Sequence, residues 1–152
     1  MFKNFLAGLK PIKIEDPYFG PLLYMKAARG HSSYWEGALN LEPLHKRIEV
    51  YIDAPSPEEP TSQAQRDFFR WVERDYSSIC SIVEERFRAE PWAQQLVSGR
   101  FEDAFCISSL SIPLCRAPGE EWSIVFEAAA DEDHIFTVHF QDREVLSVSI
   151  DG

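Results

Sequence analysis

An acidic run that ends in a histidine is the segment with the clearest potential for chemistry: Asp131-Glu132-Asp133-His134, with His139 further along. Carboxylates and imidazoles close together could hold a metal ion or transfer protons. If residues 135–140 form a strand, however, positions 134 and 139 point to opposite faces, because strand side chains alternate. The two histidines could not then share an ion, and the acidic triplet lacks the downstream spacing of an EF-hand loop. We predict instead a solvated hairpin turn, with His134 hydrogen-bonding the turn.

Two further segments combine polar or aromatic residues in a way that could serve a site. His31 is followed by Ser32 and Ser33, and a histidine near a hydroxyl could form half of a hydrolytic site. A polar turn explains the same residues. Trp35 could stack on a ligand, although a tryptophan on a strand more often packs in the core or on the sheet surface.

Three cysteines, Cys80, Cys106 and Cys115, could supply a nucleophile or metal ligands. Their number is odd, and they show neither a CxxC pair nor a metal-ligand spacing. Cys80 falls within a helical pattern and Cys106 lies between apolar neighbours, so we predict that both are small buried side chains. All three are expected to be reduced, because disulfides are rare in reducing compartments.

The sequence lacks the short motifs that mark common enzymes. It contains no GxxxxGK[ST], GxGxxG, GxSxG or HExxH segment. We therefore expect no catalytic residue, no metal site and no cofactor, and we favour a protein that is not an enzyme.

Net charge is −10 at pH 7, and it is concentrated towards the end of the chain. Residues 91–152 hold eleven acidic and three basic residues, a balance of −8. Such a field repels nucleic acid and anionic membranes, whereas it permits a basic protein partner. No apolar run approaches the roughly 20 residues that span a bilayer, and the first 13 residues do not resemble a signal peptide. A cytoplasmic location is the resulting expectation.

The pattern along the chain predicts one domain over residues 1–152. Apolar residues on one helical face suggest a short helix over residues 2–9. Strand-like runs follow over 18–27, 34–41 and 47–54, and the last of these alternates clearly. Three prolines within residues 54–60 then predict a stiff connector without regular structure.

A long helix follows the connector. Ser62 and Gln65 fit a capping box, and Pro91 should end a helix of about 28 residues. Its apolar stripe comprises Phe69, Val72, Tyr76, Ile79, Val83 and Phe87. A weaker helical signal covers 92–105, and four strands are expected over 107–112, 122–128, 135–140 and 144–150. The predicted class is α+β, a mainly antiparallel sheet in the order βββ–α–ββββ with the long helix packed on it.

Acidic residues gather at the turns of the last strands, and these turns are the predicted contact with a partner. Glu120 and Glu121 precede one strand, whereas Asp142 and Glu144 surround the final turn. In an antiparallel sheet both groups should share one end, with Asp131–Asp133 at the opposite end. Clustered charge steers association, so one of these ends is expected to contact a basic protein.

Segments spread over nearly the whole chain resemble those of a known group. They are Glu15–Gly20, Tyr34–Gly37, Ile48–Ala54, Pro60–Gln65, Asp131–Phe140 and Ser149–Gly152. In these the chain resembles an uncharacterised family of small bacterial proteins grouped as a domain of unknown function. The resemblance implies a bacterial source and one α+β domain, and it supplies no catalytic residues. Some members of similar appearance are grouped with immunity proteins of toxin systems.

Two functions remain open on the sequence alone. The first is a non-catalytic acidic binding protein, such as an inhibitor or immunity protein that neutralises a basic toxin. The second is a small enzyme or ligand-binding module with a cleft near Trp35, His31 or His134. An enzyme should show a deep pocket with convergent polar groups, whereas an inhibitor should show a flat or convex acidic face.

Overall fold

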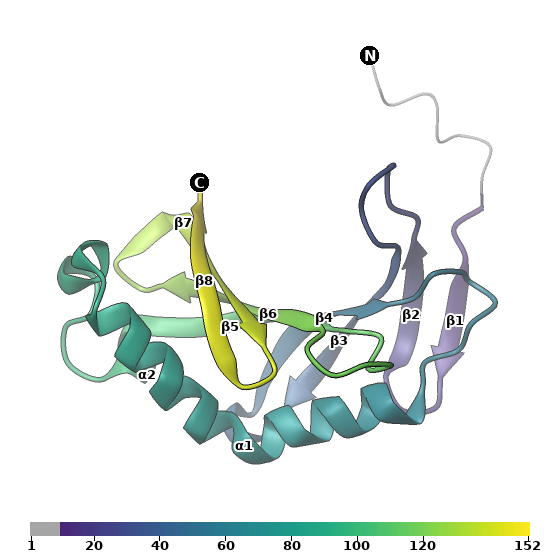
Figure 1. Ribbon diagram of the computed structural model, residues 1–152, viewed down its shortest axis with the longest axis horizontal. Helices are drawn as coiled ribbons and strands as arrows, with labels where there is room; N and C mark the ends of the chain where they lie inside the picture. Colours follow the sequence, from purple (N-terminus) through teal and green to yellow (C-terminus); the bar gives the residue numbers. More distant parts are fainter. Residues whose placement is uncertain (1–9) are drawn as a thin grey trace.

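The computed structural model describes residues 10–152, which build one eight-stranded sheet with a long helix along one face (Figure 1). The strands are β1 (Lys13–Asp16), β2 (Gly20–Met25), β3 (Tyr34–Leu41), β4 (Lys46–Asp53), β5 (Phe105–Ile112), β6 (Glu121–Ala128), β7 (Asp131–Gln141) and β8 (Glu144–Asp151). The helices are α1 (Gln63–Arg88), the four-residue α2 (Phe101–Ala104) and the 3-10 turns η1 (Glu42–Leu44) and η2 (Pro91–Gln95).

The eight strands lie side by side in chain order. Every neighbouring pair is antiparallel except β4 and β5, which are parallel. The long connection through α1 permits this arrangement, because a parallel pair cannot be joined by a tight turn. Two antiparallel halves of four strands each therefore meet at the β4–β5 pair, with α1 as the crossover between them.

The predicted α+β class, with a mainly antiparallel sheet and one long helix, is confirmed, but the predicted order of elements is wrong. Four strands precede α1 instead of three, because β1 pairs with β2 through Lys13↔Leu23 and Asp16↔Gly20. This strand has only four residues and was too short to show an alternating pattern. The run expected over 18–27 begins as a strand only at Gly20, because residues 17–19 form the turn between β1 and β2.

Helix α1 begins as the sequence predicts. Gln65 N donates to Ser62 Oγ at 3.1 Å and Ser62 N donates to Gln65 Oε1 at 3.0 Å, which completes the capping box. Gln65 Nε2 also donates to the carbonyl oxygens of Asp53 and Pro113, at the ends of β4 and β5. One glutamine thus fixes the start of the helix to both parallel strands. The helix bends near its middle (Figure 1), where Ser81 Oγ donates to Ser77 O at 3.0 Å.

The core lies between α1 and one face of the sheet. The predicted apolar stripe of the helix is confirmed, since all six of its residues are buried: Phe69, Val72, Tyr76, Ile79, Val83 and Phe87. Phe87 is the centre of an aromatic cluster, with ring centroids 4.9 Å from Phe105 and 5.6 Å from Phe101. At the other end of the helix, Phe69 packs 6.1 Å from Phe19 in the first turn of the sheet.

Three smaller predictions have mixed outcomes. Residues 54–60 contain no helix or strand, as the prolines predict. The weak helical signal over 92–105 corresponds to η2 and α2, two short turns rather than one helix. The helix predicted over residues 2–9 lies outside the described residues.

Candidate functional site

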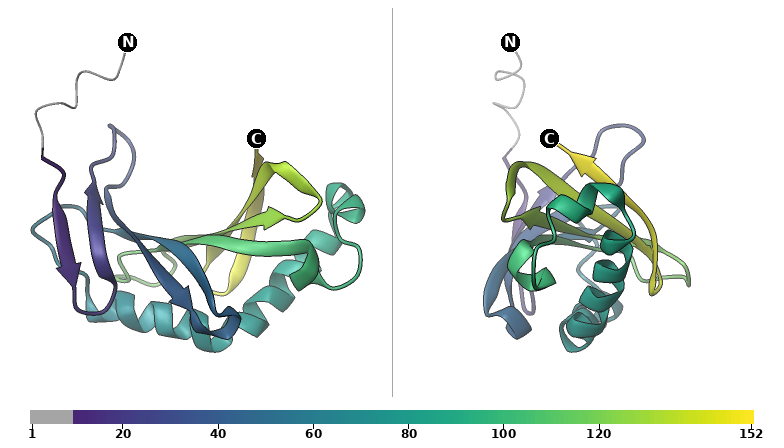
Figure 2. Two further views of the ribbon diagram at one scale, coloured as in Figure 1. Left: turned by 180° about the vertical axis from the view of Figure 1, so that it is seen from behind. Right: turned by 90° about the vertical axis from the view of Figure 1, so that its left-hand side faces the viewer.

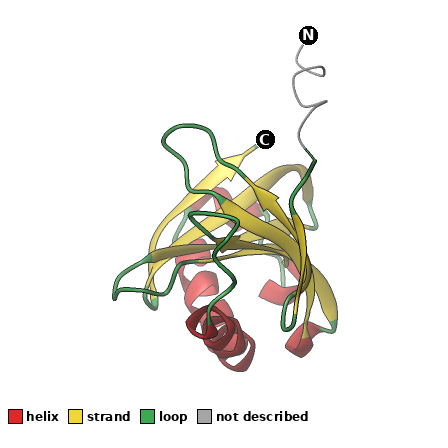
Figure 3. Ribbon diagram, turned by 90° about the vertical axis from the view of Figure 1, so that its right-hand side faces the viewer, coloured by secondary structure: helices red, strands yellow, loops and turns green. Residues whose placement is uncertain are grey.

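Polar side chains converge on the face of the sheet opposite α1. The sheet is curved, and α1 runs along one of its faces (Figure 2, Figure 3). Cross-strand partners share a face, so the pairs Glu36↔Tyr51, Glu49↔Ser109 and Cys106↔Glu127 run across this surface. We call it the open face.

The open face is hollowed in two places. A hollow of about 700 Å³ crosses β3 to β7, and its lining includes Arg47, Glu49, Tyr51, Glu127 and Ile135. Another, of about 520 Å³, lies over β1 to β3 and includes Leu23 and Glu36. Hollows of this shape suit an extended chain segment better than an enclosed small molecule, because they lie along the sheet surface.

Carboxylates and hydroxyls dominate the open face. By register, its acidic residues include Glu15, Glu36, Glu49, Glu121, Glu127 and Asp151, whereas its basic residues include Lys13 and Arg47, and Lys46 also lines the larger hollow. Ser109, Ser111, Ser123, Thr137, Ser147 and Ser149 supply short hydroxyls between them. The surface can therefore accept hydrogen bonds and ion pairs from a cationic partner.

Tyr51 lies near the centre of the open face. Its hydroxyl donates a hydrogen bond to Glu49 Oε2, and its ring lies edge-on to Tyr34 with centroids 5.5 Å apart. Burial raises the pKa of the Tyr51 hydroxyl, and its bond to the Glu49 carboxylate raises it further. The phenol is therefore protonated at neutral pH and can donate to the Glu49 carboxylate.

The predicted grouping of the acidic turns is confirmed by the strand register. Glu121 pairs with Gln141, which pairs with Glu144, so these residues share one end of the sheet with Asp142. Asp131 pairs with Ala128 at the opposite end. The β7–β8 turn approaches α1, whereas the β6–β7 turn lies away from it (Figure 1). Glu127 lies on the open face near the Asp131–Asp133 end, and Glu121 lies on the same face at the other end.

Glu120 does not belong to an exposed acidic end. Its two carboxylate oxygens accept hydrogen bonds from the backbone N–H groups of Cys115, Arg116 and Ala117, at 2.6–2.9 Å. Cys115 has a φ of 58°, the left-handed conformation that lets successive N–H groups converge on one anion. Glu120 therefore holds the β5–β6 loop together, and the prediction that it faces a partner needs correction.

The other members of that end are also engaged. Asp142 Oδ1 accepts from Gly119 N at 3.1 Å. Arg143 lies 3.6 Å from Asp75 Oδ2 and stands over the ring of Trp71. Glu121 and Glu144 remain exposed.

Asp131 and His134 form an exposed pair. His134 Nδ1 lies 2.9 Å from Asp131 Oδ1, and this contact with the carboxylate raises the pKa of the imidazole. The same hydrogen bond lowers the pKa of Asp131, although desolvation opposes the shift. The hairpin turn itself is Ala129–Ala130, so the predicted turn residues Asp131–Asp133 instead begin β7, whereas the predicted hydrogen bond of His134 to this segment is present.

His139 is not part of this pair. Its Nε2 lies 3.2 Å from Ser149 Oγ on β8. Glu132 and Asp133 are exposed beside the Asp131–His134 pair. Within residues 10–152, no three histidine, cysteine or acidic side chains are arranged to hold a metal ion.

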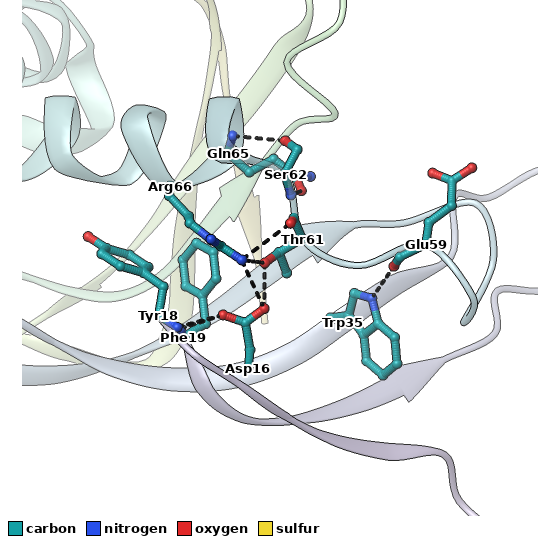
Figure 4. A network of polar contacts seen from close by, with 9 residues as sticks. All are labelled: Asp16, Tyr18, Phe19, Trp35, Glu59, Thr61, Ser62, Gln65 and Arg66. Atoms are coloured by element: carbon teal, nitrogen blue, oxygen red, sulfur yellow. Dashed lines mark hydrogen bonds and ion pairs between the residues drawn. The ribbon is translucent and has the colours of Figure 1, made fainter.

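Trp35 is not available for stacking on a ligand. Only 1% of its surface is exposed, because it points to the helix side of the sheet and packs 4.9 Å from Tyr24. Its Nε1 donates to Glu59 O at 3.4 Å (Figure 4). The binding role expected for Trp35 is therefore replaced by a structural one.

A small cavity does lie beside Trp35. It has about 190 Å³ and is lined by Asp53, Gln65 and Cys115 among others, at the ends of the parallel strands. Burial raises the pKa of Asp53, and the nearby charge of Glu120 raises it further. Burial also raises the pKa of the Cys115 thiol to about 11. A thiol that is protonated at neutral pH is a poor nucleophile, so the cavity offers no activated group for covalent catalysis.

His31 does not contribute to this cavity. It is exposed in the turn between β2 and β3, and its backbone N–H donates to Ala28 O at 3.1 Å. This is the polar turn that the sequence offered as the alternative to a hydrolytic role.

The segments Glu15–Gly20 and Pro60–Gln65 meet around Asp16 (Figure 4). The Asp16 carboxylate accepts from Tyr18 N, Phe19 N and Thr61 Oγ1, and Arg66 Nη2 lies 3.8 Å away. Burial favours the neutral acid, but these hydrogen bonds and the arginine charge together lower the pKa of Asp16. The carboxylate is thus charged, 5% exposed and fully engaged, which is a structural role.

The cysteines differ from one another more than the sequence suggested. Cys80 is buried, as predicted, and burial raises the pKa of its thiol to about 11. Cys106 is exposed, so the prediction that it is buried is wrong. Its apolar neighbours Phe105 and Ile107 point to the core, and alternation places Cys106 on the opposite side. All three cysteines are unpaired.

Comparison of the chain with protein-family models, curated proteins and solved structures gives no match. Among residues 10–152, no helix combines the length and the apolar character needed to cross a membrane.

Proposed function

We propose that the chain is a non-catalytic binding protein of the inhibitor or immunity type, and that its open face takes a basic segment of a protein partner. The observation that carries this proposal is the uncovered, hollowed sheet face on which carboxylates outnumber basic side chains. The wider charge of the chain, −10, would speed encounter with such a partner.

The partner surface extends to one acidic end. Asp131–Asp133 begin β7 beside the end of β6 that carries Glu127, so a cationic segment that lies on the open face and reaches this end would also meet these carboxylates. The opposite end is a weaker candidate, because Glu120 is bound within its own loop and Arg143 lies among the remaining acids.

An enzymatic function has less support. The cavity beside Trp35 has about 190 Å³, which is smaller than the roughly 300 Å³ at which ligand pockets usually begin. The sequence resembles a family of unknown function, and proteins of similar appearance are sometimes grouped with immunity proteins, which is in keeping with the binding function. A cytoplasmic location would suit neutralisation of a toxin inside the cell.

A capture experiment with charge-reversed variants tests the proposal. The tagged wild-type chain is used to isolate partners from an extract of the source organism, and each captured protein is produced separately. Association rates are then measured at two ionic strengths for the wild type and for a variant with Glu36→Lys, Glu49→Lys and Glu127→Lys. We expect this variant to associate at least about tenfold more slowly with a basic partner, because the steering field is reversed.

A matched control carries Glu58→Lys, Glu85→Lys and Glu102→Lys, three exposed positions away from the open face. It changes net charge by the same amount and should associate far faster than the open-face variant. If the association rates of both variants fall by the same factor, only the total charge matters and the open face is not the contact. If association is slowed only in a variant with Glu121→Lys and Glu144→Lys, the contact lies at the end of the sheet that carries the β7–β8 turn.

A further inference from the structure

Lys46 and Cys106 form a second chemical feature at the border of the open face, where Lys46 also lines the larger hollow. Lys46 Nζ lies 2.7 Å from Cys106 Sγ and 2.8 Å from Ile107 O. The carbonyl of Ile107 therefore holds the amine against the sulfur. The two residues begin the parallel strands β4 and β5 and are 60 positions apart in the chain.

The pair is reachable by small solutes. Cys106 is exposed, in contrast to the buried Cys80. A cavity of about 180 Å³ opens beside it and is lined by Lys46, Cys106, Tyr76 and Glu102 among others. This space admits several water-sized molecules, and hydrogen peroxide is only slightly larger than water.

We propose that Lys46 and Cys106 are a peroxide-dependent modification site, at which the oxidised sulfur of Cys106 becomes covalently bonded to the nitrogen of Lys46. Exposure makes a cysteine accessible to oxidation, and sulfenic acids condense with nearby nitrogen or sulfur nucleophiles. The contact between nitrogen and sulfur already exists, so the second step needs no large movement of the strands.

The chemistry balances with hydrogen peroxide as the oxidant. In the first step the Cys106 thiol and one peroxide give a sulfenic acid and one water, so sulfur is oxidised and peroxide is reduced. Lys46 then loses a proton to solvent, and its neutral amine attacks the sulfur. The nitrogen–sulfur bond forms as the sulfur–oxygen bond breaks, and the oxygen leaves as water with the remaining amine proton. The product is a sulfenamide that joins β4 to β5, and added thiol returns it to the free amine and thiol.

Cys80 is the competing nucleophile within the same cavity, because a sulfenic acid at Cys106 could instead form a disulfide. The lysine is the favoured partner for the oxidised sulfur because its nitrogen already lies 2.7 Å from Cys106 Sγ, whereas Cys80 is buried on the helix that packs against the strand.

Peptide mapping of the folded chain tests this site. The reduced protein is freed of reductant, treated with hydrogen peroxide, blocked at its remaining thiols and digested without reduction. We expect one linked pair of peptides that contains Lys46 and Cys106 and is lighter than their sum by two hydrogen atoms. Dithiothreitol should restore the two separate peptides.

Two substitutions at Lys46 distinguish the cross-link from simple oxidation. Lys46→Met keeps the aliphatic stem and Lys46→Arg keeps the positive charge, but neither has the primary amine. Both should reduce the linked peptide by about tenfold or more, and dimedone should then trap the sulfenic acid at Cys106. Cys115→Ser is the control and should leave the linked peptide unchanged.

Three results would overturn the proposal. They are a free Lys46 beside a fully oxidised Cys106, a disulfide between Cys106 and Cys80, and a linked peptide that involves a different lysine. Circular dichroism of each variant shows whether it is folded, and the two Lys46 variants provide independent measurements if one of them is not.

Discussion

Asp16 and Thr61 lie 45 positions apart, and a hydrogen bond from Thr61 Oγ1 to the Asp16 carboxylate joins them. Asp16 ends β1, whereas Thr61 directly precedes the capping residue of α1. Each is only 5% exposed. This single contact therefore connects the first hairpin of the sheet to the start of the long helix, and it stabilises a strand that is too short to persist alone.

Asp16→Asn should lower the free energy of unfolding by about 1–3 kcal/mol, because an amide cannot replace the charge beside Arg66 or all four contacts. Chemical denaturation at neutral pH measures the loss. Thr61→Val is the matched partner, since it removes only the hydroxyl and should cost less than Asp16→Asn. Equal stability of Asp16→Asn and the wild type would show that the charge and contacts of the Asp16 carboxylate do not contribute to stability.

The Asp16 carboxylate should also make the free energy of unfolding depend on pH in the acidic range. The pKa of Asp16 is lowered by folding, so its contribution is present above the ordinary value of 3.8. The contribution is lost as the pH falls from there towards the folded pKa. We expect the stability difference between the wild type and Asp16→Asn to shrink in denaturation curves below about pH 4. A difference that stays constant over this range would assign the effect to packing.

Glu120 and Glu121 are adjacent acids with different expected effects. Glu120→Ala leaves the backbone N–H groups of Cys115, Arg116 and Ala117 without their acceptor, and it should cost about 1–3 kcal/mol. Glu121→Ala removes an exposed side chain and should change stability by about 0.5 kcal/mol or less. Urea denaturation of both variants provides the measurement. A small loss for Glu120→Ala would mean that water replaces the carboxylate in the loop.

Phe87 should be among the most costly residues to truncate. Its ring is fully buried within the aromatic cluster, so Phe87→Ala should lower the free energy of unfolding by about 3–5 kcal/mol. Ile82 lies on the same helix but is 37% exposed, and Ile82→Ala should cost clearly less. If the two substitutions have equal effects in chemical denaturation, the assigned face of the helix is wrong.

Elements whose signals are local were predictable from the sequence. The start of α1 depends on Ser62 and Gln65, which are three residues apart, and the buried stripe follows from helical spacing alone. In contrast, β1 depends on a contact between Asp16 and Thr61, and no local pattern records such a pairing. The sequence therefore predicted the helix but missed the first strand.

The open face was missed for a related reason. Alternation shows which residues of β4 share a side, but not which side the single helix covers. The error at Cys106 has the same origin, because its apolar neighbours indicate the core face of β5 and not its own. Had strand order been known, the run Glu36, Tyr51 and Ser111 across three neighbouring strands would have pointed to the open face.

His134 should titrate above the ordinary value of 6.5, because the hydrogen bond from its protonated imidazole to Asp131 favours the charged form. The raised pKa means that the ion pair is present at lower pH and is lost as the pH rises through that value. NMR titration of the imidazole measures it directly. Asp131→Asn should lower the pKa of His134, since the amide carries no charge.

Glu132→Gln is the control for this titration. It removes an exposed charge next to Asp131 but none of the contacts with His134, so it should shift the pKa of the imidazole much less than Asp131→Asn does. High salt should make the His134 pKa values of the wild type and the two variants more similar, because exposed charges are screened. If Glu132→Gln and Asp131→Asn lower the pKa equally, the shift comes from the general acidity of this end of the sheet rather than from the Asp131–His134 pair.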